Sequence, residues 1–171
     1  MGYTTDFCGQ FDLDKPLTPE HKAYLAAFAD TRRMKRNPVI VEGMQDDLRK
    51  AVGLPEGVEG GYYVGSEGKY GQDNDESVVE YNQHPTGQPG LWCQWVPNKD
   101  GTAIVWDENE KFYYYVEWIE YIIEHFLKPW GYVVNGKVNW HGEGWYDTGA
   151  IRIEDNIVVS AALRVSQPPE M

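Results

Sequence analysis

Apolar and polar residues alternate from the start of the chain, and this pattern predicts a half-buried strand over residues 3–13. Tyr3, Phe7 and Phe11 fall on one face of the strand, and Cys8 falls on the opposite, more polar face. We therefore expect one side of this strand to join a core and the side that carries Cys8 to remain in contact with water.

The residues that follow carry the signals of a helix that begins at Pro19 and runs to about Met34. Thr18 is suited to cap this helix, because its hydroxyl can accept a hydrogen bond from a backbone N–H of the first turn, and proline is favoured at the first helical position. The Asn37-Pro38 pair then predicts the end of the helix, because proline disfavours helical geometry at the residue before it.

Residues 53–90 are predicted to form a long irregular segment after a second short helix, which is expected over residues 44–52. The segment holds half of the 18 glycines of the chain. One strand, at residues 62–64, is expected within it. Long loops of this kind are either functional or mobile.

The second half of the chain predicts antiparallel strands around one long helix. A hairpin is expected from strands at 91–96 and 102–106, which flank a turn that contains Pro and Gly. Between residues 112 and 128, apolar side chains recur with the helical period over about two thirds of the circumference. We therefore expect a helix that is buried on two sides.

Two further turn signals divide the rest of the chain into strands. Asn135-Gly136 predicts a type I′ turn between two short strands of residues 132–140. Asp155-Asn156 predicts a second tight turn, between strands at 150–154 and 157–162.

Together these elements predict an α+β fold with one mostly antiparallel sheet packed by two main helices. The length of 171 residues suits a single domain, which we expect to cover residues 1–166 and to include the irregular segment at 53–90. Residues 167–171, which contain two prolines, are expected to form a frayed tail.

The chain is acidic, with 27 Asp and Glu against 15 Lys and Arg and a formal net charge of −12. Such a charge opposes direct binding of nucleic acid, whose phosphates must be neutralised by Lys and Arg, and it opposes docking on an anionic membrane. It favours a protein partner with a basic surface. The acids are concentrated in residues 42–80 and 100–124, which supports this interpretation.

The start of the sequence lacks the basic and apolar regions of a secretory signal, and no apolar run reaches the roughly 18 residues that a membrane span needs. The two cysteines, Cys8 and Cys93, are too few for a disulfide framework. We therefore expect a cytoplasmic location.

No cofactor or metal site is expected from the sequence. The four histidines are scattered without a ligand spacing, and the acidic run at 73–76 lacks the glycine and glutamate that a calcium loop requires. Cys93 lies in a strand pattern and is expected to be buried, because a reactive thiolate needs electropositive surroundings. An enzyme that uses Cys93 with His84 or His125 is an alternative to the favoured non-catalytic protein.

A cluster of cations follows the first predicted helix and consists of Arg32, Arg33, Lys35 and Arg36. Cations at the end of a helix are favoured by the helix dipole, which is one interpretation of the cluster. The planar guanidinium of arginine also matches phosphate and carboxylate groups. The other interpretation is therefore that these arginines bind an anion, either a ligand phosphate or an acidic group elsewhere on this chain.

Aromatic residues are the second candidate binding feature. A groove for a flat ligand could be lined by Trp92, Trp95 and Trp106 of the predicted hairpin together with Tyr114 and Trp118 of the predicted helix, although most aromatic residues are expected in the core. The candidate ligand- or partner-binding residues are Arg32, Arg33, Arg36, Trp92, Gln94 and Trp106.

Four stretches of the sequence resemble a group of uncharacterised small acidic proteins encoded by phages, prophages and bacteria. They are FADTRRMKR (28–36), GQPGLWCQWVPNKDGTAIVWD (87–107), EKFYYYVEWIEYIIEHFLKPWGYVVNGKVNW (110–140) and GAIRIEDNIV (149–158). The resemblance implies a bacterial cytosolic setting, which is the host cytoplasm for a phage protein. It implies no assigned function and no site residues.

The sequence favours a small acidic binding protein that engages a basic partner surface, such as a phage-type modulator or inhibitor of a host factor. The first alternative is a binder of a nucleotide or small phosphate ligand that uses the aromatic and arginine residues named above. An enzyme with a cryptic site is the second alternative, and a structural or oligomer-building role is the third. No oligomeric state follows from the sequence.

Overall fold

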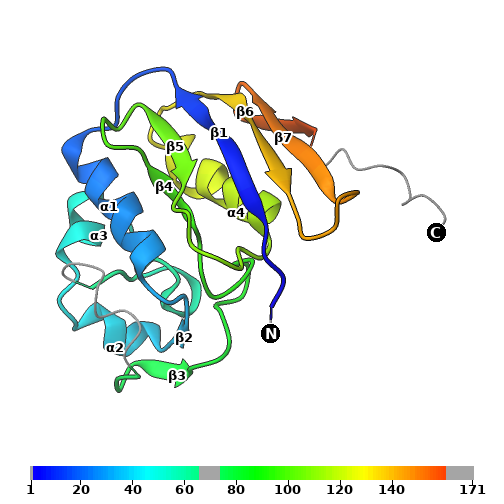
Figure 1. Cartoon of the computed structure of the whole chain (residues 1–171). Helices are drawn as coiled ribbons and strands as arrows, with labels where there is room; N and C mark the ends of the chain where they lie inside the picture. Colours follow the sequence, from blue (N-terminus) through cyan, green and yellow to red (C-terminus); the bar gives the residue numbers. More distant parts are fainter. Residues whose placement is uncertain (1, 66–73, 161–171) are drawn as a thin grey trace. The chain divides into compact units, whose positions relative to one another are not determined.

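A computed structural model of the chain describes residues 2–65 and 74–160 (Figure 1). The chain divides into two compact units. The sheet unit comprises Met1–Pro16 and Gln94–Met171, and the helical unit comprises Leu17–Cys93. The expected tail at 167–171 and residues 66–73 of the expected irregular segment lie outside the described residues.

The fold is α+β, as predicted, and the sheet unit is built on a six-stranded sheet in the order β4-β5-β1-β6-β7-β8. All neighbouring strands in it are antiparallel, and β1 pairs with β6 along its whole length. The strands are β1 (Asp6–Leu13), β4 (Trp95–Pro97), β5 (Ala103–Trp106), β6 (Val134–His141), β7 (Thr148–Glu154) and β8 (Ile157–Ser160).

Strand β6 runs unbroken through Asn135-Gly136, so the turn expected at this pair is wrong. Gly136 lies opposite Phe11 of β1 and has a φ of 148°. A Cβ atom at this position would lie 2.7 Å from the backbone oxygen of Gln10. The glycine is therefore required by the close approach of β1 to β6, and not by a reversal of the chain.

The other two turns are confirmed. Strands β4 and β5 form the expected hairpin, and β7 pairs with β8 across Asp155-Asn156. Asp155 and Asn156 have φ values of 48° and 72°, as a type I′ turn requires. The Asn156 side chain also accepts a hydrogen bond from the Val134 N–H at 2.7 Å, which ties this turn to the start of β6.

The long helix expected at 112–128 is present as α4 (Tyr115–Ile122), which continues directly into the π-helical turn η2 (Ile123–Leu127). It begins at Tyr115 because Tyr114 adopts left-handed backbone geometry, with a φ of 59°. Helix α4 lies against one face of the sheet (Figure 1). The Trp95 Nε1–H donates to the Tyr115 carbonyl at 2.8 Å and so fixes the first turn of the helix to β4.

Aromatic side chains dominate the core between the sheet and α4. The Phe7 ring of β1 lies 5.4 Å from Trp95, 5.3 Å from Trp106, 5.7 Å from Phe112 and 4.9 Å from Tyr115, measured between ring centres. These pairs are tilted or edge-to-face, which are the favourable arrangements of aromatic rings. The face of β1 that was predicted to be apolar therefore joins the core.

In the helical unit, α1 (Pro19–Asp30) begins as predicted, because Thr18 Oγ1 accepts a hydrogen bond from the His21 N–H at 3.1 Å. The expected extension of this helix to Met34 is wrong. Thr31 is extended, and its hydroxyl donates to the Ala27 carbonyl at 2.7 Å, which satisfies one acceptor at the helix end. The basic cluster therefore follows the helix, and its last two residues, Lys35 and Arg36, form a short strand.

Short elements make up the rest of the helical unit. The helix expected over 44–52 is shorter, and the strand expected at 62–64 is not formed. Within the described residues, no helix is both long and apolar enough to cross a lipid bilayer. The elements are β2 (Lys35–Arg36), α2 (Pro38–Glu42), α3 (Asp47–Ala51), η1 (Val58–Gly60) and β3 (Val78–Glu80).

Candidate functional site

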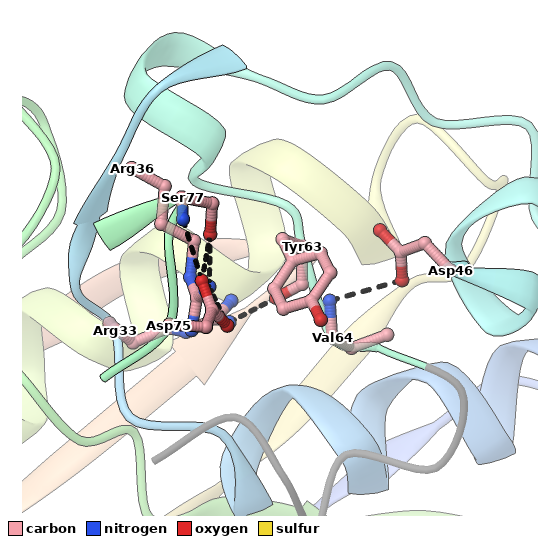
Figure 2. Close-up of polar contacts among 7 residues, drawn as sticks. All are labelled: Arg33, Arg36, Asp46, Tyr63, Val64, Asp75 and Ser77. Carbon is pink, nitrogen blue, oxygen red and sulfur yellow. Dashed lines mark hydrogen bonds and ion pairs between the residues drawn. The ribbon is translucent and has the colours of Figure 1, made fainter. Parts of the chain in front are cut away.

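Arg33 is buried in the helical unit, with only 2% of its surface exposed. Its guanidinium donates to the carbonyl of Gly61 at 3.1 Å and to that of Tyr63 (Figure 2). Its Cζ also lies 4.2 Å from the centre of the Phe28 ring, a cation–π contact. Arg33 therefore joins the end of α1 to residues 61–63.

Arg36 is the second buried arginine, with 1% of its surface exposed. Its Nη1 lies 3.1 Å from Asp75 Oδ2 and donates to Ser77 Oγ at 2.6 Å (Figure 2). Partial burial raises the pKa of Asp75, but hydrogen bonds from Ser77 and the charge of Arg36 together outweigh burial and leave this pKa lowered. The pair therefore favours an ionised Asp75.

Arg32 is half-buried and is also held by this chain. It donates to the Tyr81 carbonyl at 3.2 Å and to Asn82 Oδ1 at 3.1 Å, and it lies over the Tyr81 ring at 4.2 Å. The helix-dipole interpretation of the cluster is wrong, because α1 ends at Asp30. Of the two anions expected for these arginines, the acidic group elsewhere on the chain is the one observed, at Arg36.

Asp46 is a fully buried carboxylate next to α3. It lies 2.5 Å from Arg49 Nε and accepts a hydrogen bond from the Val64 N–H at 3.2 Å (Figure 2). Burial raises the pKa of Asp46, and the hydrogen bonds from Arg49 and Val64 offset this effect only in part. Asp46 therefore ties residue 64 to α3, and the buried polar network has a structural role in the helical unit.

The candidates on the hairpin lie in different units and have different surroundings. Trp92 belongs to the helical unit and is 37% exposed. Gln94 belongs to the sheet unit, where it is buried and donates to the Glu110 carbonyl at 3.2 Å. Trp106 is half-buried, and its Nε1–H donates to the Asn109 carbonyl at 3.2 Å. Gln94 and Trp106 therefore hold the loop between β5 and α4.

Cys93 is fully buried, and His125 stacks on Tyr121 with 4.0 Å between the ring centres. Burial lowers the pKa of His125 and so disfavours its charged form. A buried thiol is inert towards substrates in solution, so this geometry does not support an enzyme that uses Cys93. Among the residues that the structure describes, no cluster of three His, Cys, Asp or Glu could hold a metal ion.

The loop between β5 and α4 contains three non-glycine residues with left-handed backbone geometry. Their φ values are 70° at Glu108, 60° at Lys111 and 59° at Tyr114. Such values are uncommon outside glycine and occur where the surroundings enforce them, often at functional sites. Here the loop is held by hydrogen bonds. The Asn109 N–H donates to Asp107 Oδ1 at 2.9 Å, and the side chains of Gln94 and Trp106 donate to the carbonyls of Glu110 and Asn109.

Tyr3 connects this loop to the loop at residues 142–147. The Tyr3 N–H donates to the Tyr113 hydroxyl at 3.1 Å. The Tyr3 hydroxyl accepts from the Glu143 N–H at 2.9 Å and donates to the Asp147 carboxylate. The hydrogen bond to Asp147 raises the pKa of Tyr3. Three segments that are distant in the sequence therefore form one continuous surface.

This surface exposes large aromatic side chains beside carboxylates. Trp145 is 56% exposed and Tyr114 is 58% exposed, although buried positions are the usual place for such rings. The sequence signal for it is a Trp in a Gly-rich acidic stretch, Gly142 to Asp147, outside any periodic pattern. We define the aromatic–acidic surface as Tyr3, Tyr113, Tyr114, Glu143, Trp145, Tyr146 and Asp147.

Comparisons of the chain with protein-family models, with curated proteins and with solved structures found no significant match. The resemblance to proteins of phages and bacteria therefore stays a prediction.

Proposed function

We propose that this protein is a small acidic binding protein that acts in the cytoplasm and engages a basic surface of a partner protein. The observation that carries the proposal is the aromatic–acidic surface. Tyr and Trp are enriched at protein interfaces, where a few such side chains contribute most of the binding free energy. Exposed rings on a folded surface therefore support a role in binding.

The surface offers two complementary contacts to a Lys or Arg side chain of the partner. The faces of Trp145 and Tyr114 attract a cation, and the exposed carboxylate of Glu143 can form charge-assisted hydrogen bonds with it. The net charge of −12 steers a basic partner towards the protein and repels an anionic one. The chemistry therefore supports a basic partner.

The loops that carry these side chains are fixed before a partner binds. Tyr3 connects them by three hydrogen bonds, and the loop before α4 has enforced backbone geometry at Tyr114. A surface that is ordered in advance loses less conformational entropy on binding, which favours affinity.

The same chemistry fits a modulator of a nucleic-acid-binding host factor if the protein is phage-encoded. Carboxylates on a rigid surface would occupy the Lys and Arg side chains that otherwise contact phosphate. Arg32, Arg33 and Arg36 do not contribute to this proposal, because their donors are used within the helical unit.

Affinity capture tests the proposal. The intact protein is immobilised, incubated with bacterial lysate and eluted with steps of increasing salt, and the affinity of the purified partner is then measured. We expect a partner with a basic surface whose affinity falls as salt rises, because salt screens charges at the edge of the interface. Trp145→Ser and Glu143→Gln should each weaken binding about tenfold or more.

Two matched variants serve as controls. Val79→Ser removes an exposed apolar side chain from the helical unit, and Glu20→Gln removes an exposed carboxylate from α1. Both should leave the affinity unchanged. A partner whose binding is insensitive to salt, or is weakened equally by the controls, would contradict the proposal.

A further inference from the structure

The face of the sheet that points away from α4 carries polar, exposed side chains. On this face Cys8 of β1 lies opposite Asn139 of β6, which in turn lies opposite Ala150 of β7. Residues that lie directly opposite each other in antiparallel strands point to the same face. The next row along the strands therefore places Lys137 beside Arg152.

A hollow of about 530 Å³ lies on this face of the sheet. At its centre β7 contributes Ala150, opposite Asn139, so only a methyl group from β7 fills the space there. The volume lies within the range of small-molecule sites. Its polar and thiol-bearing lining residues are Asp6, Cys8, Lys137, Asn139, His141 and Thr148.

Lys137 lines one end of the hollow, and Arg152, which lies opposite Lys137 on β7, is exposed beside it, so the two form a pair of like charges. Like charges directly opposite each other destabilise a sheet. Among the described residues, neither has an ion pair, whereas Lys35, Arg36 and Arg49 are each paired with a carboxylate. A bound anion would neutralise both cations, so the pair indicates an anionic ligand.

The other charges on this face limit where the anion can lie. Asp6 stands opposite His141 at the far end of the hollow, and Asp12 and Glu154 lie beyond the cation pair. Lys137 of the cation pair is four positions along β6 from His141, which lies in the row of Asp6, and this spacing is about 13 Å along a strand. A ligand that fits has an anionic group at one end and a polar, uncharged group at the other.

We propose that this hollow binds a small phosphomonoester of the size of a nucleoside monophosphate. The Lys137 ammonium and the Arg152 guanidinium donate charge-assisted hydrogen bonds to the phosphate. The organic group lies over Ala150, where Asn139, Asp6 and Thr148 offer donors and acceptors. The residues of this site differ from those of the aromatic–acidic surface, and the proposal does not depend on the proposed function.

Alkylation of Cys8 tests the proposal in the intact protein. Cys8 lines the hollow and is exposed, whereas Cys93 is buried, so iodoacetamide should modify Cys8 in the native state. The modification rate is measured by mass spectrometry at physiological salt, where distant acids are screened, with AMP, adenosine or inorganic phosphate added. AMP at ten times its Kd should slow the reaction about tenfold, adenosine should leave it unchanged, and phosphate should bind more weakly than AMP.

Variants separate the two parts of the site. The double variant Lys137→Gln with Arg152→Gln should weaken AMP binding about tenfold or more. Lys128→Gln is the control, because it removes one positive charge at an exposed position directly after η2, and it should leave AMP binding unchanged. Ala150→Leu should fill the hollow and remove protection by AMP without a change in charge. It also tests the site if the double variant fails to fold.

Three results would overturn the proposal. The first is an alkylation rate that neither AMP nor phosphate changes up to about 10 mM. A Kd above that concentration is too weak to count as specific binding. The second is protection by adenosine equal to that by AMP, which would show that the phosphate is not recognised. The third is a loss of binding in Lys128→Gln equal to that in the double variant.

Discussion

Arg36 and Asp75 form an ion pair across 39 positions of sequence, and the two partners differ in exposure. The Arg36 side chain is 1% exposed, whereas that of Asp75 is 31% exposed. A buried charge without a counter-charge is far less stable than an exposed one. The arginine is therefore the member of the pair that depends on its partner.

Removal of the carboxylate should destabilise the helical unit. We expect Asp75→Asn to lower the free energy of unfolding by about 3 kcal/mol, because it removes the carboxylate that pairs with the buried Arg36 charge. Glu76→Gln is the matched control, since Glu76 is an exposed neighbour and the change in charge is the same. It should change stability by about 0.5 kcal/mol or less in urea unfolding. Equal effects of the two variants would show that the ion pair does not stabilise the fold.

The carboxylates of Asp75 and Asp46 should affect the pH dependence of stability with opposite signs. The pKa of Asp75 is lowered in the folded state, so its contribution is present above the unfolded pKa near 3.8 and is lost as pH falls through the folded pKa. The pKa of Asp46 is raised, so the folded state holds this proton more tightly than the unfolded chain. Stability from Asp46 therefore falls as pH rises from 3.8 towards the raised folded pKa.

Urea unfolding from about pH 2.5 to 7 checks these signs. The stability difference between the native protein and Asp75→Asn should grow as pH rises. The difference in stability between the native protein and Asp46→Asn should instead shrink as pH rises. Slopes of the same sign for both variants would mean that the environment of one carboxylate is not as the structure places it.

Elements that depend on neighbouring residues could be predicted from the sequence. The Thr18 cap needs a partner three residues away, and the Asp155-Asn156 turn needs two residues that tolerate positive φ. The end of α1 does not follow from the sequence pattern, because it depends on Thr31, whose hydroxyl competes for a helix carbonyl. That choice between helix and extended chain is close in energy and is decided by the tertiary surroundings.

The candidate sites depend on contacts over longer separations, which the sequence does not specify. The acceptors of Arg33 and Arg36 lie 28 to 41 positions away, and Tyr3 meets Glu143 140 positions away. A cluster of arginines therefore predicts anion recognition without showing that its acceptors belong to the same chain. The pairing of Lys137 with Arg152 likewise follows only from the strand register.

Gly136 shows how one residue type can serve two structural purposes. The Asn-Gly pair is the common signal of a type I′ turn, because glycine tolerates positive φ. In β6 the same tolerance is combined with a close approach of the backbone of β1, at Gln10. A positive φ and a close approach of neighbouring backbone are therefore two separate reasons for a glycine. Their effects can be separated by comparing glycines to which neither, one or both of these reasons apply.

Alanine substitutions at three glycines should therefore give three levels of destabilisation. Gly43 has a negative φ, and a new Cβ there would lie 3.7 Å from the Ile40 carbonyl oxygen, so Gly43→Ala should be nearly neutral. Gly53 has a φ of 75° with open space around it, so Gly53→Ala should cost about 1 kcal/mol from backbone strain alone. Gly136→Ala adds a backbone contact at 2.7 Å and should cost about 3 kcal/mol, measured by urea unfolding. If Gly136→Ala were no worse than Gly53→Ala, the β1–β6 pairing at Gln10 would be looser than the structure shows, and a turn at Asn135-Gly136 would again explain the glycine.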